Sequence, residues 1–335
     1  MSDLETAQSL SLARRLRYWA EAAPFFLFMG LFRILGIDAA SALGGLIGRQ
    51  VFYRIRPVVN RARENLRAAY PDLPAREIER IAREMCDNLG RTVAEYPHLD
   101  KLGISGPDPR LEIVGKENAD AAIARGKGVM FISGHFANWE GMPVMATQLG
   151  YEGGLVYRPP NNPYVDRFIS RMRASAGPQI QISKGAQGTR RIFTLLRRGL
   201  CILMLVDQKT DQGVAAPFFG RDAMTTPAPA ALALKLGAVL LPASNERLGG
   251  ARFRMTVHPP IEFSPSGDHD ADIRALTSKI NAAMEACVRA RPSQWLWIHR
   301  RWPTARDATK YAQAAKPQAL AGAGVVVERE GSSLL

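Results

Sequence analysis

The chain has 335 residues, of which 47% are apolar, so it is long enough for one large domain or two small ones with a sizeable core. Its 44 Lys and Arg against 31 Asp and Glu give a formal net charge of +13, which indicates an acidic partner: an anionic membrane, a phosphorylated substrate, an acidic protein or nucleic acid. The three cysteines are scattered and odd in number, which argues against a disulfide framework and a zinc site and favours a reducing, cytoplasmic setting.

The N-terminal region alternates apolar and basic segments. Two apolar runs cover 22–32 and 34–47, separated by Arg33, and neither reaches the roughly 20 residues that a clean transmembrane helix needs. Tyr18 and Trp19 precede them, where aromatic residues of a membrane interface are expected. Six arginines follow the second run: Arg49, Arg54, Arg56, Arg61, Arg63 and Arg67.

We expect residues 1–60 to form a membrane anchor segment, inserted as one tilted span or as an interfacial helical hairpin. Anionic headgroups would hold the following arginines on the cytoplasmic side, which predicts attachment to the inner membrane. One alternative is a signal peptide cleaved near 40–42, which the many charges disfavour. The other is an ordinary buried helix pair.

The rest of the chain predicts an α/β domain. An amphipathic helix is expected at 77–96, and from about residue 111 apolar strands alternate with helices. Strands are predicted at 128–133, 154–157, 179–182, 201–206, 239–243 and 252–258, and helices at 138–149, 164–176, 189–198, 228–236 and 270–291. This alternation predicts a mainly parallel sheet flanked by helices. We assign 61–304 to this domain and 305–335, by its composition, to a disordered tail.

Polar residues follow three of the predicted strands directly. His135 comes after the first strand, Arg158 after the second and Asp207 after the fourth. Because active sites in open α/β sheets gather at the carboxyl ends of the strands, we expect these three side chains to meet at one edge.

His135 is the candidate general base, since imidazole has the unperturbed pKa closest to neutrality. Glu140 follows five residues later, and its carboxylate can reach back if His135 lies in the turn and Glu140 in the first turn of the next helix. Such a pair deprotonates a hydroxyl for attack on an acyl group without a Ser or Cys nucleophile. The alternative is a core histidine bonded to the backbone.

Several other sites are absent from the sequence. There is no G-x-S-x-G, no phosphate-binding G-x-x-x-x-G-K-[ST] and no complete G-x-G-x-x-G. His135 has no histidine four residues later, and the other histidines lack metal-ligand spacing. We therefore expect neither a metal nor a cofactor.

Five blocks occur in order along the chain: Asn65-Leu66 with Tyr70-Pro71; Gly134 to Glu140 (GHFANWE); Tyr157-Arg158-Pro159 with Asn162-Pro163 and Asp166; Asp207-Gln208 with Phe218-Phe219-Gly220; and Gln294 to Trp302 (QWLWIHRRW). The second block has the H-x-x-x-x-D/E spacing of acyltransferases. Together the blocks resemble the lipid A biosynthesis acyltransferases of lauroyl or myristoyl type, which add a secondary acyl chain to the lipid A precursor.

The resemblance implies a glycerolphosphate-acyltransferase-like fold and transfer of a fatty acyl chain from acyl carrier protein to a hydroxyl of a hydroxyacyl chain on a phosphorylated glycolipid. It implies catalytic roles for His135, Glu140, Arg158 and Asp207. Three further residues are expected to bind substrate: Asn138, Arg300 and Arg301. For the last two, a cation–π stack that closes the domain is an equal alternative to phosphate binding.

Other functions stay open on the sequence alone. The acceptor could be another phospholipid or an aminolipid, with acyl-CoA as a possible donor. A non-catalytic basic membrane-surface protein is a second alternative, and it would tolerate loss of His135. A nucleic-acid partner is not expected, because the N-terminal basic residues lie beside apolar runs and are not interleaved with stacking aromatics.

Overall fold

The computed structural model describes residues 11–177, 180–210 and 213–302. Its N-terminal part is helical, with α2 (Leu12–Leu35), α3 (Ile37–Gln50), a 3-10 turn η1 (Phe52–Arg54), α4 (Arg56–Ala69), α5 (Ala75–Glu95) and a second 3-10 segment η2 (Tyr96–Lys101). The two apolar runs predicted from the sequence thus lie in two helices. Gly36, with φ of 75°, separates α2 from α3 in a conformation that favours glycine.

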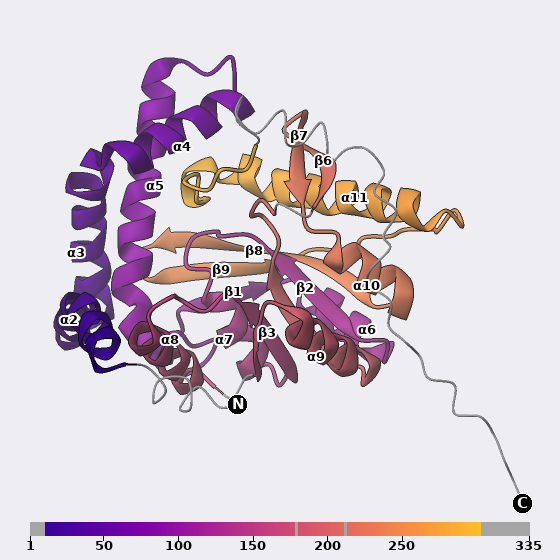
Figure 1. The fold of residues 1–335 in the computed structure, drawn as a ribbon, viewed down its shortest axis with the longest axis horizontal. Coiled ribbons are helices and arrows are strands. Elements are labelled where there is room, and N and C mark those ends of the chain that lie inside the picture. Colours follow the sequence, from indigo (N-terminus) through magenta and orange to yellow (C-terminus); the bar gives the residue numbers. More distant parts are fainter. Residues whose placement is uncertain (1–10, 178–179, 211–212, 303–335) are drawn as a thin grey trace, which may run out of the picture. The chain divides into compact units, whose positions relative to one another are not determined.

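Helix α3 packs along α5, and the two stand side by side in Figure 1. Glycines make the close approach possible: a Cβ on Gly48 would lie 2.0 Å from the carbonyl oxygen of Cys86, and one on Gly90 would lie 2.1 Å from that of Gly44. The backbones therefore touch without intervening side chains. The predicted anchor boundary at residue 60 falls within α4.

The centre of the domain is a seven-stranded sheet in the order β1-β9-β8-β2-β5-β3-β4. The strands are β1 (Leu111–Val114), β2 (Val129–Ser133), β3 (Gly153–Tyr157), β4 (Ile180–Ser183), β5 (Cys201–Leu205), β8 (Val239–Gly249) and β9 (Arg252–Val257). Only the β8–β9 pair is antiparallel among the pairs of this sheet. The predicted α/β fold with a mainly parallel sheet and an N-terminal helical segment is confirmed.

Helices cover both faces of the sheet. They are α6 (Lys116–Ala124), α7 (Gly141–Gln148), α8 (Pro163–Ser175), α9 (Ala186–Arg197), α10 (Ala228–Leu236) and α11 (His269–Ala290), followed by the 3-10 turn η3 (Pro292–Gln294). Alternate residues of β2 pack to opposite sides: Met130 and Ile132 join the core of α5, α9, α10 and α11, while Phe131 joins that of α6 and α7 (Figure 1). A central strand such as β2, which is buried along its whole length and apolar up to Ser133, is expected where both faces of a sheet are covered.

Several elements differ from the sequence prediction, and neither β1 nor α6 was among the predicted ranges. A separate antiparallel hairpin, β6 (Val214–Phe218) with β7 (Arg221–Thr225), packs against α11 and was not predicted. The helix expected from residue 138 begins only at Gly141, because 134–140 form an irregular loop. The tail predicted from residue 305 lies outside the described residues.

Candidate active site

The loop 134–140 leaves the carboxyl end of β2 and is held by α5. Ala137 adopts a positive φ of 45°, which is uncommon for a residue with a side chain. Its carbonyl oxygen accepts hydrogen bonds from Thr92 Oγ1 at 2.9 Å and Asn88 Nδ2 at 3.3 Å, and its N–H donates to the Gln294 carbonyl at 2.8 Å. These bonds fix the unusual backbone that presents His135.

His135 is paired with Asp207. Its Nδ1 lies 2.8 Å from Asp207 Oδ1, and its backbone N–H donates to Oδ2 at 2.7 Å. Trp295 Nε1 donates a third hydrogen bond to Oδ2 at 2.8 Å. The pairing follows from the parallel register of β2 and β5, which places Ser133 opposite Leu205. His135 and Asp207 each lie two residues later, so they also face one another.

Asp207 is 3% exposed yet remains ionised. Burial alone would raise the pKa of its carboxyl, but attraction to His135 when that ring is protonated, together with the hydrogen bonds from His135 and Trp295, outweighs burial and holds that pKa well below its usual range. An ionised Asp207 accepts the proton on His135 Nδ1. The other ring nitrogen, Nε2, then carries a lone pair and is competent to accept a proton from a substrate.

Glu140 is not the partner of this imidazole, and here the prediction of a His–Glu pair is wrong. Its carboxylate receives two hydrogen bonds from Arg173 on α8, at 2.7 and 2.9 Å, and one from the Tyr96 hydroxyl at 3.1 Å. Burial would lower the pKa of Arg173, but the charge of Glu140 and the hydrogen bonds to it keep that pKa raised. Arg173 has no motif around it in the sequence and was not predicted.

Asn138 is also not available to a substrate. It is completely buried, and its Nδ2 donates to Glu95 Oε2 at 2.9 Å while its carbonyl oxygen accepts from Asn245 Nδ2. Glu95 itself pairs with Arg247 on β8 and accepts from the Ser41 hydroxyl of α3 at 2.6 Å. The predicted substrate-binding role of Asn138 is corrected to a structural one, namely fastening the loop to α5.

His135 opens onto a cavity of about 390 Å³. Arg158 at the end of β3 lines it, together with Lys184 at the end of β4, so the predicted convergence of His135, Arg158 and Asp207 at one edge of the sheet is confirmed. The whole lining consists of His135, Trp139, Glu140, Met142, Pro143, Leu155, Val156, Tyr157, Arg158, Arg173, Lys184, Leu205, Gln208 and His299. Burial and the neighbouring Arg158 lower the pKa of Lys184, against the charge of Asp207.

A second histidine and an amide lie beside the base. Gln208 Nε2 is 3.2 Å from His135 Nε2 and 3.2 Å from His299 Nε2. Burial, with a smaller contribution from the charge of His135, lowers the pKa of His299 to about 4, so this ring is neutral at pH 7. Trp139 packs edge-on against His135, with ring centroids 5.1 Å apart.

The two C-terminal arginines have different surroundings. Arg301 is 1% exposed and donates to Met224 O at 3.1 Å, Thr225 Oγ1 at 2.8 Å and Asn281 Oδ1 at 2.9 Å, with Phe218 beneath its guanidinium. It therefore closes the core against β7 and α11, and its predicted contact with substrate phosphate is wrong. Arg300 is exposed but is not among the residues that line the cavity.

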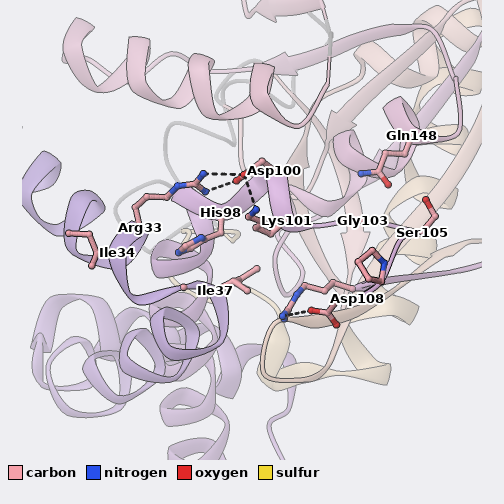
Figure 2. Close-up of a pocket in the computed structure, with 13 residues that line it drawn as sticks. Arg33, Ile34, Ile37, His98, Asp100, Lys101, Gly103, Ser105, Asp108 and Gln148 are labelled. Carbon is pink, nitrogen blue, oxygen red and sulfur yellow. Dashed lines mark hydrogen bonds and ion pairs between the residues drawn. The ribbon is translucent and has the colours of Figure 1, made fainter.

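A larger cavity, of about 790 Å³, lies elsewhere, between the end of α2 and the 101–110 loop (Figure 2). Charged residues of its lining are paired with one another: Arg33 with Asp100 at 2.7 Å, and Arg110 with Asp108 at 2.6 Å. Cavity size alone therefore does not identify the reactive centre. The paired histidine beside the smaller cavity does.

A histidine held by a buried carboxylate at the carboxyl edge of a parallel sheet is an arrangement in which an imidazole can act as a general base. The family model of the bacterial lipid A biosynthesis acyltransferases matches residues 7–304 of the chain. The chain belongs to this family, and it is an acyltransferase.

Individual relatives share about a quarter of their residues with the chain. The lipid A biosynthesis palmitoleoyltransferase of Escherichia coli K12 is 27% identical over 278 residues, covering 77% of this chain and 84% of the relative. The E. coli lauroyltransferase is 27% identical over 252 residues, covering 72% and 77%. A phosphatidylinositol mannoside acyltransferase of Mycobacterium tuberculosis H37Rv is 24% identical over 205 residues, covering 60% and 63%.

Among solved structures, the 1-acyl-sn-glycerophosphate acyltransferase PlsC of Thermotoga maritima matches 76% of this chain and 96% of its own, at 13% identity. The TM-score is 0.30, a likeness too low to carry an argument. The strand order and pairings described above define the fold independently.

Proposed function

We propose that this acyltransferase transfers a fatty acyl chain from acyl carrier protein to a hydroxyl of a hydroxyacyl chain on a phosphorylated lipid A precursor. The observation that carries the proposal is the contact of His135 Nδ1 with Asp207 Oδ1 at 2.8 Å, beside a cavity lined by cationic residues, in a chain of this family. With His135 as the general base, the acceptor hydroxyl attacks directly and no covalent nucleophile of the enzyme is required.

The chemistry assigned to the site is direct attack by the acceptor hydroxyl. His135 Nε2 takes the hydroxyl proton as the oxygen bonds to the thioester carbon, and the carbonyl π electrons move to its oxygen. Collapse of the tetrahedral intermediate breaks the carbon–sulfur bond, and the leaving thiolate receives the proton from Nε2. Asp207 stabilises the imidazolium that forms between these two steps.

The positive charge of the cavity and of the whole chain favours the binding of anionic substrates. Arg158 and Lys184 line the cavity, and the chain carries a net charge of +13. Both an acidic carrier protein and a phosphorylated glycolipid would be attracted to such a surface. Arg158 suits a phosphate oxygen pair because its planar guanidinium can donate two parallel hydrogen bonds.

Membrane attachment through α2 is part of the proposal. By length and composition this helix could cross a membrane, and only 17% of its most apolar 18-residue stretch is buried. The large apolar residues that this helix exposes form a stripe on one side of it: Leu12, Leu16, Trp19, Leu27, Phe28, Leu31, Ile34 and Leu35. We place the enzyme at the inner membrane with its active domain facing the cytoplasm, where its acyl donor would be available.

A different acceptor is the second candidate. It is favoured by the match to the mycobacterial phosphatidylinositol mannoside acyltransferases, whose acceptor by name is a glycosylated phospholipid. The cavity residues and the base would serve either hydroxyl acceptor. A non-catalytic membrane-surface role would not explain why the buried carboxylate of Asp207 is paired with His135 beside a cavity.

The test supplies the full-length protein in detergent with an acyl-loaded carrier protein and a bisphosphorylated glucosamine disaccharide bearing 3-hydroxyacyl chains. Mass spectrometry should find the acceptor heavier by one acyl group in place of one hydrogen, and His135→Ala should form no product above background. Product with a phosphatidylinositol mannoside acceptor but none with the disaccharide would select the second candidate. Full activity in folded His135→Ala would overturn both.

A further inference from the structure

Resting on the proposed acyl transfer, we propose that Gln208 is a catalytic residue that donates a hydrogen bond to the oxyanion of the tetrahedral intermediate, and that His299 is the positioning residue that aims its amide. Acyl transfer places a full negative charge on the former carbonyl oxygen, and a preorganised donor for that oxygen is commonly a large contribution to rate. The mechanism built on His135 and Asp207 alone provides no such donor.

The hydrogens can be assigned from the contacts. His135 Nδ1 is 2.8 Å from the ionised Asp207, so its proton lies there and its Nε2 offers a lone pair. Gln208 Nε2 lies 3.2 Å from that lone pair and 3.2 Å from His299 Nε2. An amide nitrogen has two N–H bonds and can donate one to each ring. The reverse orientation would put the amide oxygen against the His135 lone pair, which is repulsive.

The free enzyme therefore holds the amide against its own base. When the acceptor hydroxyl binds to His135 Nε2, it takes the place of one Gln208 N–H, which is then free within the cavity where the thioester carbonyl must lie. The second N–H stays with His299, so the amide keeps its position. The freed N–H donates to the oxygen as the carbonyl π electrons move onto it, and the bond weakens when the carbonyl re-forms and the thiolate leaves.

His299 is suited to hold the amide because its own position is fixed. Its carbonyl oxygen accepts from Asn65 Nδ2 at 2.6 Å, and the same amide reaches Trp297 O at 2.6 Å. Trp295 and Trp297, which precede it, are buried. A ring that is neutral at pH 7 offers an Nε2 lone pair to Gln208 in its Nδ1–H tautomer, whereas a protonated ring would repel the amide hydrogens.

The cations of the cavity are less suited to this role. Arg158 is exposed, and no contact joins Lys184 to the imidazole, whereas Gln208 is partly buried at hydrogen-bond distance from the atom that removes the proton. The oxyanion forms on the atom next to the one under attack, so its donor must lie close to His135 Nε2. The two cations are better placed to attract phosphate at the mouth.

The experiment measures steady-state kinetics of the full-length protein with the carrier-protein donor and the disaccharide acceptor. Gln208→Ala should lower kcat by roughly 10²–10³-fold with little change in either KM, as expected for loss of one oxyanion donor. His299→Ala should lower kcat by a smaller factor, and the double variant should be no slower than Gln208→Ala, because the two residues act as one unit. Gln148→Ala, which removes an amide from the cavity of Figure 2, is the matched control and should keep wild-type kcat.

A second variant separates catalysis from folding. Gln208→Glu is nearly isosteric but has no N–H, so its kcat should fall as far as that of Gln208→Ala, and its carboxylate should raise the kinetic pKa of the base in the profile of kcat/KM against pH. That shift requires residue 208 to lie beside His135 in a folded site, so a variant that shows the shift but has lost kcat has lost catalysis and not its fold. Wild-type kcat in folded Gln208→Ala or Gln208→Glu would overturn the assignment, as would a greater loss of kcat in Lys184→Met. Inactivity of the wild-type protein would instead overturn the proposed function.

Discussion

The carboxylate of Glu140 lies against the guanidinium of Arg173, with Oε1 at 2.7 Å from Nη2 and Oε2 at 2.9 Å from Nε. Both side chains line the cavity next to His135, yet the carboxylate of Asp207, far away in sequence, is the one that bonds the imidazole. The carboxylate of the H-x-x-x-x-E spacing, Glu140, therefore joins the loop to α8, and the carboxylate that follows β5, Asp207, orients the imidazole of His135.

We expect Asp207→Asn to lower kcat by on the order of 10⁴-fold, because the amide favours the wrong histidine tautomer while keeping the shape of the site. His135→Ala combined with Asp207→Ala should be little slower than His135→Ala, since the pair acts as a unit. Steady-state kinetics of the three variants test this. A second, additive loss in the double variant would separate the roles of the two residues.

Breaking the Glu140–Arg173 pair should lower the stability of the fold more than it lowers kcat. Removing either partner leaves a buried charge uncompensated, so Glu140→Gln or Arg173→Met should lower the free energy of unfolding by about 3–5 kcal/mol. Urea titration followed by circular dichroism measures this. The joint replacement Glu140→Gln with Arg173→Met should recover much of the loss. If the double variant folds as stably as wild type but still lacks activity, the ion pair also contacts substrate.

Arg301→Ala should unfold the C-terminal block and leave substrate affinity of the remaining folded protein unchanged. Each acceptor that loses its donor, among Met224 O, Thr225 Oγ1 and Asn281 Oδ1, costs roughly 1–3 kcal/mol. Thermal denaturation of Arg301→Ala beside Arg300→Ala makes a matched comparison, because Arg300 is exposed. Equal melting temperatures for the two variants would contradict the structural role of Arg301.

The sequence could predict which strand ends would meet but not which side chains would pair. Apolar runs followed by His135, Arg158 and Asp207 indicate a common edge, since parallel strands carry their carboxyl ends together. The choice between Glu140 and Asp207 as the partner of His135 depends on β2 and β5 being neighbours in register, a tertiary fact. Proximity in sequence favoured Glu140, and nothing local marked Arg173 on α8 as its partner.

Burial explains the remaining differences between prediction and structure. Asn138 and Arg301 both lie in motif blocks, and polar residues in such blocks suggest contact with substrate. Whether they face a cavity or the core depends on packing: Asn138 meets Glu95 of α5, and Arg301 meets β7 and α11. The hairpin β6–β7 lacks the regular alternation from which strands are predicted, because Pro217 and three small residues interrupt it.

Stability should fall in acid because of His299. Its pKa is lowered from 6.5 to about 4 by burial, so the folded state binds fewer protons than the unfolded state between these values. The stabilisation is fully present above about pH 6.5 and is lost as the pH falls toward 4, by as much as about 3 kcal/mol. Urea titrations across this range should show the fall in wild type and a flatter dependence in His299→Gln. A fall of the same size in the variant would assign it to other groups.

The two faces of α2 predict how the protein meets the membrane. One face is committed to the domain: the Tyr18 carbonyl accepts from Asn162 Nδ2 at 2.8 Å, Phe25 packs edge-on against Phe168 of α8, and Arg33 pairs with Asp100 of η2. The opposite side presents the apolar stripe, with Leu27 at 74% and Ile34 at 84% exposure. A helix that crosses the bilayer would have to give up these contacts with the domain, so α2 should lie in the membrane interface with its stripe in the acyl region.

Protease protection distinguishes the two topologies. An epitope tag before residue 1 should be shielded from protease added outside spheroplasts and cleaved after lysis, because an interfacial α2 leaves both ends of the chain in the cytoplasm. Leu27→Glu combined with Ile34→Glu should move the protein from the membrane to the soluble fraction, since charge in the stripe removes its affinity for the acyl region. Arg17→Glu is the matched control, because it changes the charge of the same helix at a position outside the stripe. Cleavage of the tag in intact spheroplasts would show that α2 spans the bilayer and leaves its place on α8.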